Sequence, residues 1–409
     1  MSYRFVKVTN HYREYLKDYY RRNPDIVRKT YAEQMQHIMS EGYGWADFFA
    51  VHLRNLGVDA HEIIANALPL QQTWVREHDI KTSGKDTVIA QLKALQPDVV
   101  FFQDSFRFNG AWITYLREQV PSITQVIAWC CAPFTDENIQ QFKVFDYILT
   151  CHPGYYQELT GRGLRMHHLN HAIESSLLPK ISCSNLSKDI DCIFIGSLAT
   201  GEGFHNNRIK LLEKIIESNL KLNIYGAWQN SNLVKYLLKQ GSYIAAKTLK
   251  AVGLSSLAKE LLGWKAVIGE NPHTFGRRYS KVLNSVLQPP LYGIDMLSVL
   301  SCAKVGLNFH IDAAGRYAGN VRLYEVTGVG SCLLTDWKEN LHELFEIDTE
   351  IVTYKSADEC LEKAKWLLEH PKEREAIAKA GQARTLRDHT YEKRALQLDS
   401  IIQREFKNS

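Results

Sequence analysis

Residues 304–336 read KVGLNFHIDAAGRYAGNVRLYEVTGVGSCLLTD, and the order of segments in this stretch decides the fold class. Two short apolar runs, at 304–309 and 331–336, enclose a polar loop with glycines and an amphipathic segment at 321–328. A buried strand, a helix and a second buried strand in this order form the repeating unit of a parallel sheet covered by helices. The polar loop then follows the carboxyl end of a strand, which is where open α/β sheets bind their ligands.

The same alternation continues through the chain and predicts an α/β protein with two Rossmann-like domains that face each other across a central cleft. Buried strands are expected at residues 3–9, 59–65, 98–103, 124–129, 147–151, 166–171, 191–197, 220–226, 304–309, 331–336 and 350–354. Helical periodicity is found at 31–57, 110–119, 206–219, 321–328 and 356–370, the last of which opens with a Ser356/Glu359 capping box. The length of 409 residues favours two domains, because one core rarely grows beyond about 250–300 residues. We expect an N-terminal domain over 1–178, a linker over 179–189 and a C-terminal domain over 190–388.

The composition argues against several classes of protein. Its hydrophobic fraction of 45% and charged fraction of 23% are those of an ordinary globular protein. A net charge of +4 without a concentrated basic stripe gives no indication of nucleic-acid binding. The chain shows neither a signal peptide nor an apolar run of about 18 residues, so we expect a cytoplasmic protein. The eight cysteines form no CxxC pair and mostly lie in apolar segments, and we interpret them as reduced core residues.

Residues 229–290 interrupt the second domain with helical, cation-rich material. Between 228 and 281 there are nine lysines and arginines and two acidic residues. An inserted helical lid with a solvated basic face would have this composition. A surface in peripheral contact with an anionic membrane or an anionic acceptor would have it as well.

A glycine-containing loop before residue 206 is the first candidate for ligand binding. Gly196, Gly201 and Gly203 let a ligand approach the backbone, and the following helix offers free N–H groups and a positive dipole end to a phosphate. Arg208 adds a charge in the first turn of that helix. A plain connecting loop is the alternative.

The second candidate is the segment that follows His310. Asn320 is expected to cap the helix that starts near residue 321. Arg322 and Glu325 are three residues apart and therefore share a face near its amino end. An arginine there can bind a diphosphate in a bidentate manner, and a glutamate can accept hydrogen bonds from two ribose hydroxyls. An ion pair within the helix is the alternative.

Aromatic and strand-end residues complete the set of candidates. Tyr225 with Gly226, and Tyr292, are expected either to form a flat slot for a nucleobase or to be core residues. In the first half, strand ends direct four side chains toward the cleft: Asp104, Trp129, His152 and His171. A carboxylate or imidazole among them can act as a base for an acceptor hydroxyl, although a lone histidine after a strand often has a structural role. No G-x-S-x-G or H-E-x-x-H motif is present, which argues against a serine hydrolase or a zinc protease.

The segment NVRLYEVTGVGSCLLTDWKENLHELFE at 320–346 and the run after it closely resemble the C-terminal domain of bacterial group 1 glycosyltransferases of the spore-maturation-protein type. These are relatives of glycosyltransferase family 4 with the GT-B fold. The resemblance extends over 190–400, and more loosely over DVVFFQDS and FDYILTCHPGYYQELTGRG in the first half. It implies transfer of a sugar from a nucleoside-diphosphate donor to a glycan or lipid-linked acceptor in cell-envelope or polysaccharide biosynthesis. It also implies a last helix, 389–409, that packs back on the N-terminal domain.

The expected donor-binding residues are Gly196, Ser197, Arg208, Tyr225, Gly226, Tyr292, Gly319, Asn320, Arg322 and Glu325. The candidates for catalysis are Asp104, His152 and Asn320. Glu325 stands where family 4 enzymes have the second glutamate of their Glu-x7-Glu motif, whereas Tyr317 stands where they have the first. Such proteins typically work without a bound metal or cofactor, because helix dipoles and cationic side chains neutralise the leaving diphosphate. The DID run at 189–191 begins a buried strand, so we do not expect it to bind a metal.

Retention of the anomeric configuration is expected from the resemblance alone. An in-line displacement with Asp104 or His152 as base would instead invert it. Two other functions stay open on the sequence: a non-catalytic GT-B module that binds a glycan or an anionic surface, and a nucleotide-sugar epimerase of the same fold.

Overall fold

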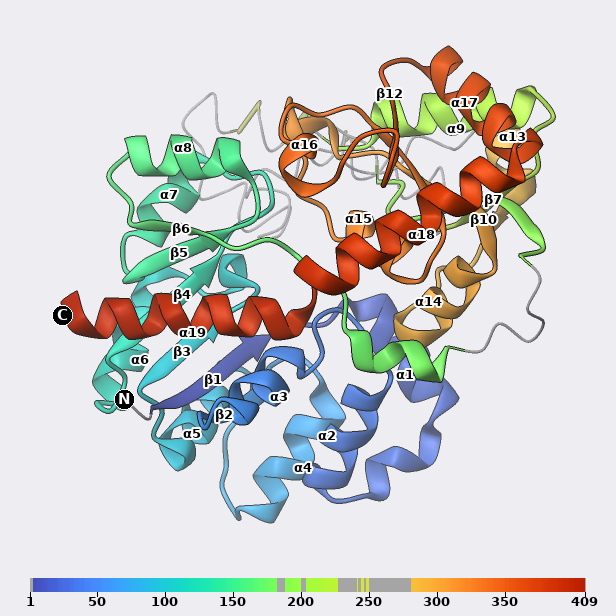
Figure 1. Cartoon of the computed structure of the whole chain (residues 1–409). Helices are drawn as coiled ribbons and strands as arrows, with labels where there is room; N and C mark the ends of the chain where they lie inside the picture. The colour runs from blue at the N-terminus through green and yellow to red at the C-terminus, as the bar shows by residue number, and fades with distance from the viewer. Residues whose placement is uncertain are drawn as a thin grey trace.

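The computed structural model contains two six-stranded parallel sheets with covering helices (Figure 1). It describes residues 3–181, 188–199, 204–226 and 281–408, together with the short pieces 241, 244–245 and 248–249. Most of the predicted insertion at 229–290 lies outside the described residues, as do Cys183, Gly201 and Gly203.

The first sheet has the strand order β2-β1-β3-β4-β5-β6. Its strands are β1 (Arg4–Thr9), β2 (Asp59–Ile64), β3 (Val99–Phe102), β4 (Gln125–Trp129), β5 (Tyr147–Thr150) and β6 (Met166–His168). The helices of this half are α1 (Arg13–Arg22), α2 (Tyr31–Ser40), α3 (Phe48–Asn55), α4 (Leu68–Glu77), α5 (Lys85–Leu95), α6 (Gly110–Gln119), α7 (Asp136–Phe142) and α8 (Pro153–Gly161). Three 3-10 segments are η1 (Pro24–Arg28), η2 (Ser105–Arg107) and η3 (Ser175–Lys180), the last of which leads to the second half.

The second sheet has the order β12-β11-β10-β7-β8-β9. Its strands are β7 (Ile190–Ile195), β8 (Leu222–Tyr225), β9 (Leu287–Gln288), β10 (Ala303–Asn308), β11 (Cys332–Asp336) and β12 (Val352–Tyr354). Its helices are α9 (Asn206–Glu217), α13 (Lys281–Val286), α14 (Gly293–Ser301), α15 (Arg322–Gly328), α16 (Leu341–Leu344), α17 (Ala357–Glu369) and α18 (Pro371–Asp388), with a 3-10 turn η5 (Asp312–Ala314).

Each sheet has a point at which the strand order reverses. In the first sheet the chain runs from β1 outward to β2 and returns to β3 on the other side of β1. In the second sheet it runs from β7 to β8 and β9, and returns to β10 beside β7. Loops that leave two such neighbouring strands go to opposite faces, which opens a crevice at the carboxyl ends of the strands. Ligand-binding groups are therefore expected after β1 and β3, and after β7 and β10.

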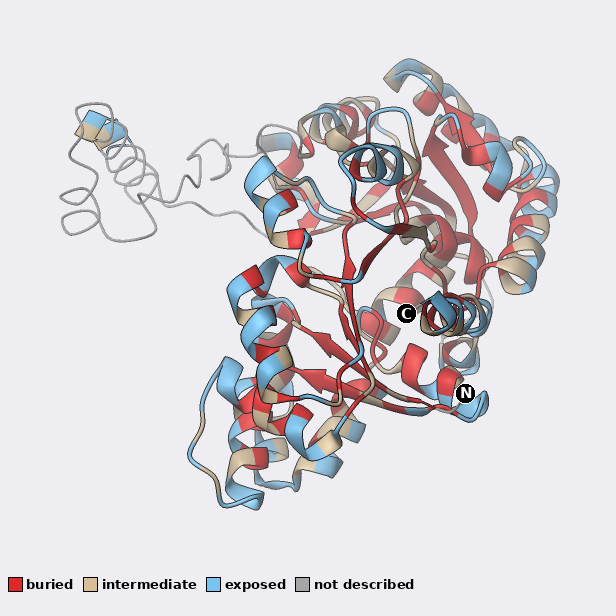
Figure 2. Cartoon of the chain, turned by 90° about the vertical axis from the view of Figure 1, so that its left-hand side faces the viewer, coloured by how far each residue is buried: buried red, intermediate tan, exposed pale blue. Residues whose placement is uncertain are grey.

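The strands are buried because helices cover both faces of each sheet. β3, β4, β5 and β11 consist entirely of buried residues, a pattern typical of parallel sheets. Figure 2 shows these buried strands between helices whose outer faces are exposed. One apolar cluster includes Phe49 of the first half and Leu323 of the second, so the two halves share part of their core.

The last helix, α19 (Tyr391–Asn408), packs against α3 of the N-terminal half. Tyr3 donates a hydrogen bond of 2.8 Å to Asp399, and His167 lies 2.8 Å from a carboxylate oxygen of Glu405. In Figure 1 this helix runs along the first sheet, although it follows the second domain in the chain. Like every other helix in the described part of the chain, it lacks the length or the apolar character to cross a bilayer.

The predicted fold class is confirmed, and each predicted strand is present with its ends shifted by a few residues. The predicted helical segment 31–57 is two helices, because Gly42 and Gly44 take positive φ angles of 63° and 65° between them. Only half of the predicted capping box of α17 is formed. Ser356 accepts from the backbone N–H of Glu359 at 3.1 Å, but the Glu359 carboxylate accepts from the N–H of Lys355 at 2.7 Å.

Candidate functional site

The crevice of the second sheet contains a buried arginine. Arg208, in the first turn of α9, donates a hydrogen bond of 2.6 Å to the carbonyl oxygen of Ser197, which follows β7. A second nitrogen of the same guanidinium donates to the carbonyl oxygen of Phe309, which follows β10. Arg208 therefore spans the two strands between which the strand order reverses.

The surroundings of Arg208 suit a multiply charged anion. Burial lowers the pKa of Arg208 to about 10; the carboxylates of Asp336 and Asp312 act against this, and the neighbouring Arg322 adds to it. Within the described residues, Nε of Arg208 has no hydrogen-bond partner. A buried guanidinium with an unused donor, next to a second guanidinium, can bind phosphate oxygens.

A buried pair, His310 and Asp336, lies at the ends of β10 and β11. Nδ1 of His310 is 2.7 Å from Oδ1 of Asp336, and the backbone N–H of His310 donates to the same oxygen at 3.0 Å. Burial alone would raise the pKa of Asp336, but His310 and Lys338 outweigh it and hold the pKa below its ordinary value. Asp336 is thus an anion that offsets the charge of Arg208. The pair was missed on the sequence, where the only signal for it is that both residues end or closely follow strands.

Asn320 does not cap α15, which corrects the prediction. The helix starts at Arg322 after Val321, and no side chain within the described residues caps this end. Asn320 instead donates a hydrogen bond of 2.7 Å to Oδ1 of Asn308, and Asn308 donates to Thr335 at 2.9 Å. These bonds join the start of α15 to the ends of β10 and β11, so Asn320 positions the helix. Its catalytic role stays a prediction.

Arg322 and Glu325 form an ion pair of 2.8 Å, and both side chains are largely buried. Nη1 of Arg322 also lies 3.1 Å from the sulfur of Met296. The alternative interpretation, an ion pair within the helix, is therefore present. Arg322 nevertheless lies close enough to Arg208 to lower its pKa, so the structure brings the two predicted phosphate-binding cations near each other.

Four further predicted residues lie at the ends of β7 and β8. A Cβ on Gly226 would be 3.0 Å from the carbonyl oxygen of Gly196, and the N–H of Gly196 donates to the carbonyl oxygen of Tyr225 at 3.1 Å. Gly226 thus has a packing reason, because the absence of a side chain lets the end of β8 approach the end of β7 closely. Ser197 contributes its carbonyl oxygen to Arg208.

Tyr292 packs against the N-terminal half. Its ring stands edge-on to those of Tyr15 and Tyr43, with centroids 5.4 Å apart in both pairs. Tyr15 and Tyr43 are stacked at 3.7 Å. On the sequence, Tyr292 could line a nucleobase slot or pack in a core. The packing against Tyr15 and Tyr43 is by itself a sufficient reason for an aromatic side chain at this position.

Asp104 lies at the crevice of the first sheet, two residues after β3. Burial raises the pKa of Asp104, and the guanidinium of Arg107 at 3.5 Å partly offsets this. One third of its side chain is exposed. A partly exposed carboxyl with a raised pKa can accept a proton from a bound hydroxyl, so this position fits the predicted base.

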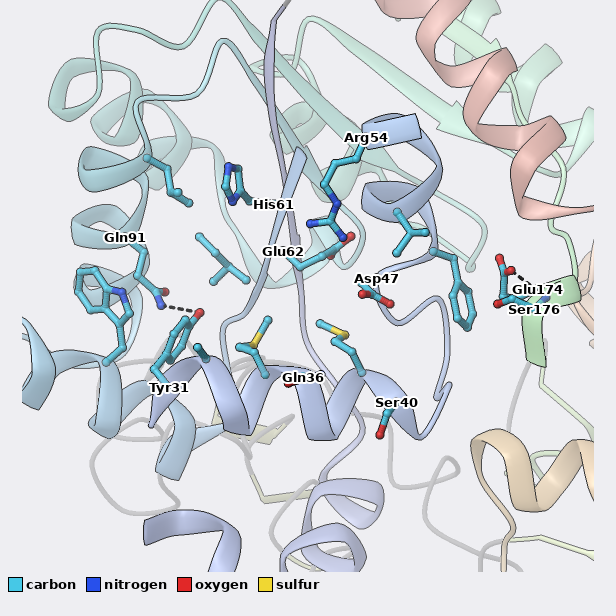
Figure 3. A pocket seen from close by; sticks show the side chains of 18 of the residues that line it. Tyr31, Gln36, Ser40, Asp47, Arg54, His61, Glu62, Gln91, Glu174 and Ser176 are labelled. Atoms are coloured by element: carbon cyan, nitrogen blue, oxygen red, sulfur yellow. Dashed lines mark hydrogen bonds between the residues drawn. The ribbon is translucent and has the colours of Figure 1, made fainter. Parts of the chain in front are cut away.

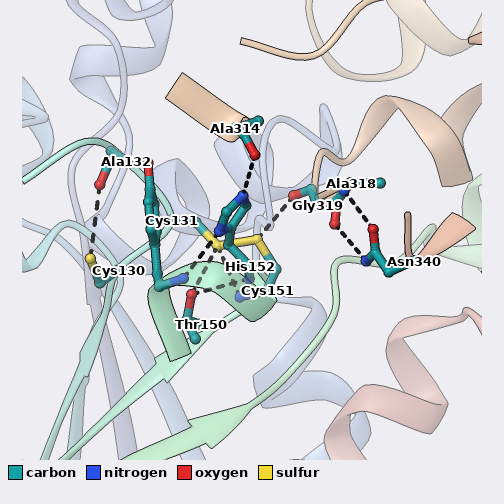
Figure 4. Close-up of a disulfide and its surroundings, with 11 residues drawn as sticks. Cys130, Cys131, Ala132, Thr150, Cys151, His152, Ala314, Ala318, Gly319 and Asn340 are labelled. Atoms are coloured by element: carbon teal, nitrogen blue, oxygen red, sulfur yellow. Dashed lines mark hydrogen bonds between the residues drawn. A yellow bond between two sulfur atoms is a disulfide. The ribbon is translucent and has the colours of Figure 1, made fainter. Parts of the chain in front are cut away.

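His152 links the two halves of the chain. Its Nε2 lies 3.0 Å from the carbonyl oxygen of Ala314, and its Nδ1 accepts from the N–H of Tyr155 at 3.2 Å. Burial lowers the pKa of His152. Because both ring nitrogens contact the backbone, neither points freely to an acceptor hydroxyl in this arrangement (Figure 4).

The loop between β10 and α15, residues 309–321, also contacts the N-terminal half. A Cβ on Gly319 would be 3.0 Å from the carbonyl oxygen of Cys151, so glycine permits this close approach. Tyr317 stands edge-on to His152, with ring centroids 5.8 Å apart. The residue that replaces the expected glutamate therefore packs between the two halves.

The prediction that the cysteines are reduced is wrong for one pair. Cys131 and Cys151 form a disulfide. They follow β4 and β5, which are neighbours in the sheet, so the strand order brings the two side chains together. Four buried thiols agree with the prediction: Cys130, Cys192, Cys332 and Cys360.

A separate cavity of about 700 Å³ lies between α2 and β2 (Figure 3). Its lining is mainly apolar and includes Met35, Met39 and Trp74. It also includes the buried Glu62, which lies 3.2 Å from Lys7 and whose pKa burial raises to about 8. The predicted site residues do not line this cavity, which is distinct from both crevices.

Known proteins resemble the chain in fold. Residues 208–400, just under half of the chain, match a family model described as Glycosyl transferase-like. No curated protein matches. Among solved structures, a glycosyltransferase from Rickettsia africae ESF-5 has 11% identity and a TM-score of 0.55, with 100% of both chains covered. A sucrose-phosphate synthase from Thermosynechococcus elongatus has 11% identity and a TM-score of 0.56, with 99% of this chain and 100% of that chain covered. Anabaena HepE in complex with UDP and glucose has 10% identity and a TM-score of 0.57, with 98% and 99% covered.

The fold is therefore of the GT-B type, with two Rossmann-like domains. The segment that matches the glycosyltransferase-like family model is 208–400. It begins at Arg208 and contains Asn320, Arg322 and Glu325. The spore-maturation-type subgroup stays a prediction.

Proposed function

We propose that this protein is a glycosyltransferase that moves a sugar from a nucleoside-diphosphate sugar to a glycan or lipid-linked acceptor. The observation that carries the proposal is the position of Arg208, which spans β7 and β10 where the strand order reverses. Arg322 is its cationic neighbour, and Asn320 ties the start of α15 to the same strand ends. The match of 208–400 to a glycosyltransferase-like family supports the same assignment.

In this proposal, the protein stabilises the leaving diphosphate electrostatically. As the bond between the anomeric carbon and the diphosphate oxygen breaks, negative charge grows on that oxygen, and Arg208 and Arg322 neutralise it. The carboxylate of Glu325 accepts hydrogen bonds from the ribose hydroxyls, and these replace part of its ion pair with Arg322. No metal or bound cofactor takes part in the mechanism we propose.

We place the acceptor at the crevice of the first sheet, beside Asp104. A retaining transfer delivers the acceptor oxygen to the face that the diphosphate leaves. An inverting transfer would use Asp104 as the base for the acceptor hydroxyl, because its position after β3 and its raised pKa suit that role. The anomeric coupling constant of the product, measured by NMR, distinguishes the two.

The test uses the full-length protein and a panel of nucleoside-diphosphate sugars. We expect one donor to bind in calorimetry and to release its nucleoside diphosphate slowly, and a glycan or lipid-linked acceptor to accelerate the release. If no donor binds and no donor releases its nucleoside diphosphate, the proposal is contradicted. Conversion of the donor sugar without an acceptor and without release would instead indicate an epimerase.

We further propose that the protein acts in the cytoplasm at a membrane surface. The support is the excess of lysine and arginine between 228 and 281. Sedimentation with vesicles should show binding to anionic vesicles that declines with added salt. Equal binding to neutral vesicles would contradict this.

A further inference from the structure

Three potential metal ligands meet beside the contact between the two halves. Sγ of Cys131, Sγ of Cys151 and a ring nitrogen of His171 all lie within 4.8 Å of one another. These residues follow β4, β5 and β6, so three neighbouring parallel strands bring them together. Two sulfurs and one imidazole nitrogen are three ligands of a tetrahedral site with one position left.

The imidazole of His171 has a nitrogen that lacks a partner. Its ring packs against those of Trp45 and Trp129, with centroids 5.7 and 5.3 Å away. Nδ1 is buried and has no hydrogen-bond partner within the described residues. Because a buried polar atom without a partner costs free energy, its retention here calls for an explanation, and a bound cation supplies one.

The backbone around the two cysteines favours charged sulfur. The N–H of Cys151 points to Sγ of Cys131 at 2.9 Å, and such a contact stabilises a thiolate. Cys151 directly precedes His152, the N-cap of α8, and so stands at the positive end of that helix. These are the conditions under which a cysteine ligates a metal ion.

We propose that Cys131, Cys151 and His171 form a redox-gated binding site for a thiophilic divalent cation such as Zn²⁺. The site borders the loop 309–321, because Sγ of Cys151 lies 2.9 Å from the carbonyl oxygen of Gly319 (Figure 4). A cation there therefore lies next to the loop that leads into α15. The proposal is independent of the glycosyltransferase assignment.

The redox step decides whether the site exists. The two sulfurs form a disulfide in the structure, and a disulfide sulfur is not a thiolate ligand. A dithiol reductant supplies two electrons and two protons, the S–S bond breaks, two thiols form, and the reductant becomes a disulfide. Zn²⁺ then replaces the two thiol protons and forms two zinc–sulfur bonds.

The test is a Zn²⁺ titration of the full-length protein against a chromophoric chelator, before and after reduction under anaerobic conditions. We expect the reduced protein to bind about one equivalent of Zn²⁺, and the oxidised protein not to compete with the chelator. Co²⁺ used as a probe should give thiolate-to-cobalt charge-transfer absorption with the reduced protein only. If the reduced protein binds Zn²⁺ no more tightly than the oxidised protein, the proposal is overturned.

Substitutions locate the ligands. Cys131→Ser, Cys151→Ser and His171→Asn should each weaken Zn²⁺ binding by at least about tenfold in the reduced protein. Cys302→Ser, at the end of α14 and outside the cluster, is the matched control and should bind as the wild type does. His171→Asn leaves both sulfurs in place, so it tests the site even where a serine variant fails to fold. Unchanged Zn²⁺ affinity in His171→Asn overturns the proposal.

Discussion

Arg208 in α9 donates a hydrogen bond of 2.6 Å to the carbonyl oxygen of Ser197 at the end of β7. A strand and the helix that follows it in the chain are thus joined by a buried guanidinium, which also reaches the neighbouring strand β10 through Phe309. The same group is the strongest candidate for binding a diphosphate. In the proposed function, stability and donor binding are therefore coupled at this residue.

Arg208→Ala is expected to lower both the free energy of unfolding and donor affinity. The change leaves the carbonyl oxygens of Ser197 and Phe309 without this donor, and the lost bonds come from a charged group. We expect urea denaturation to show a loss of about 2–4 kcal/mol. Lys210→Ala, exposed on the same helix, is the control and should change stability by less than about 0.5 kcal/mol. An Arg208→Ala protein as stable as the wild type would refute the structural role.

Substitutions at Arg322 and Glu325 should separate contacts to the diphosphate from contacts to the ribose. Arg322→Ala should weaken the binding of both nucleoside diphosphate and inorganic diphosphate by about tenfold to a hundredfold, because it removes charge-assisted hydrogen bonds. Glu325→Gln should weaken only the binding of the nucleoside diphosphate, because we propose that the Glu325 carboxylate accepts hydrogen bonds from the ribose hydroxyls. Calorimetry with the two ligands measures this. The control is Arg387→Ala, an exposed arginine whose partner is Asp388. If both variants bind donor normally, the site assignment is wrong.

Stability should fall on mild acidification because histidines are buried without charge. Nδ1 of His389 accepts a hydrogen bond of 2.8 Å from Arg394, and burial, with this arginine nearby, lowers the pKa of His389 to about 4. Burial also lowers the pKa of His11 and of His205 to about 3. Between these values and the unfolded value of about 6.5, the unfolded chain binds more protons than the folded one. The stabilisation is therefore complete above about pH 6.5 and is lost as the pH falls toward 4.

Urea denaturation between pH 7 and about pH 4 checks whether the free energy of unfolding falls as the pH is lowered. His389→Gln should make the decline shallower, because one of the groups that takes up protons on unfolding is gone. His78→Gln, at an exposed position after α4, is the matched control and should follow the wild-type slope. A free energy of unfolding that is constant over this range would contradict the prediction.

The fold was predictable from the sequence because each strand is a short apolar run with polar punctuation on both sides. VVFF at 99–102 and CLLTD at 332–336 are buried on both faces, and no other element type explains runs of this length between amphipathic segments. Arg208 was found for a related reason, since its place in the first turn of a helix after a strand is a local feature of the chain.

Contacts between segments were not predictable in the same way. The bond between Asn320 and Asn308 depends on how a loop folds back to the strand it leaves, whereas helix capping was the local expectation. The disulfide of Cys131 and Cys151 requires β4 and β5 to be neighbours, and strand order is not encoded in hydrophobic periodicity. Tyr292 likewise has a role that only the packing of one half on the other defines.

Gly293 is the position at which the contact between the two halves should be most sensitive to a small change. Its φ is 53°, and a Cβ there would lie 2.0 Å from the carbonyl oxygen of Glu41 in the N-terminal half. The same oxygen accepts a hydrogen bond of 3.0 Å from the N–H of Ile294, so the backbone cannot move away without losing this bond. Gly293→Ala should therefore lower the free energy of unfolding by about 1–3 kcal/mol.

Gly293→Ala should also increase the radius of gyration in X-ray scattering, because the halves have to separate locally. Gly161→Ala, where a Cβ meets nothing within 4 Å, is the matched control. Equal stability of the two variants would show that the contact between Gly293 and Glu41 does not hold the halves together.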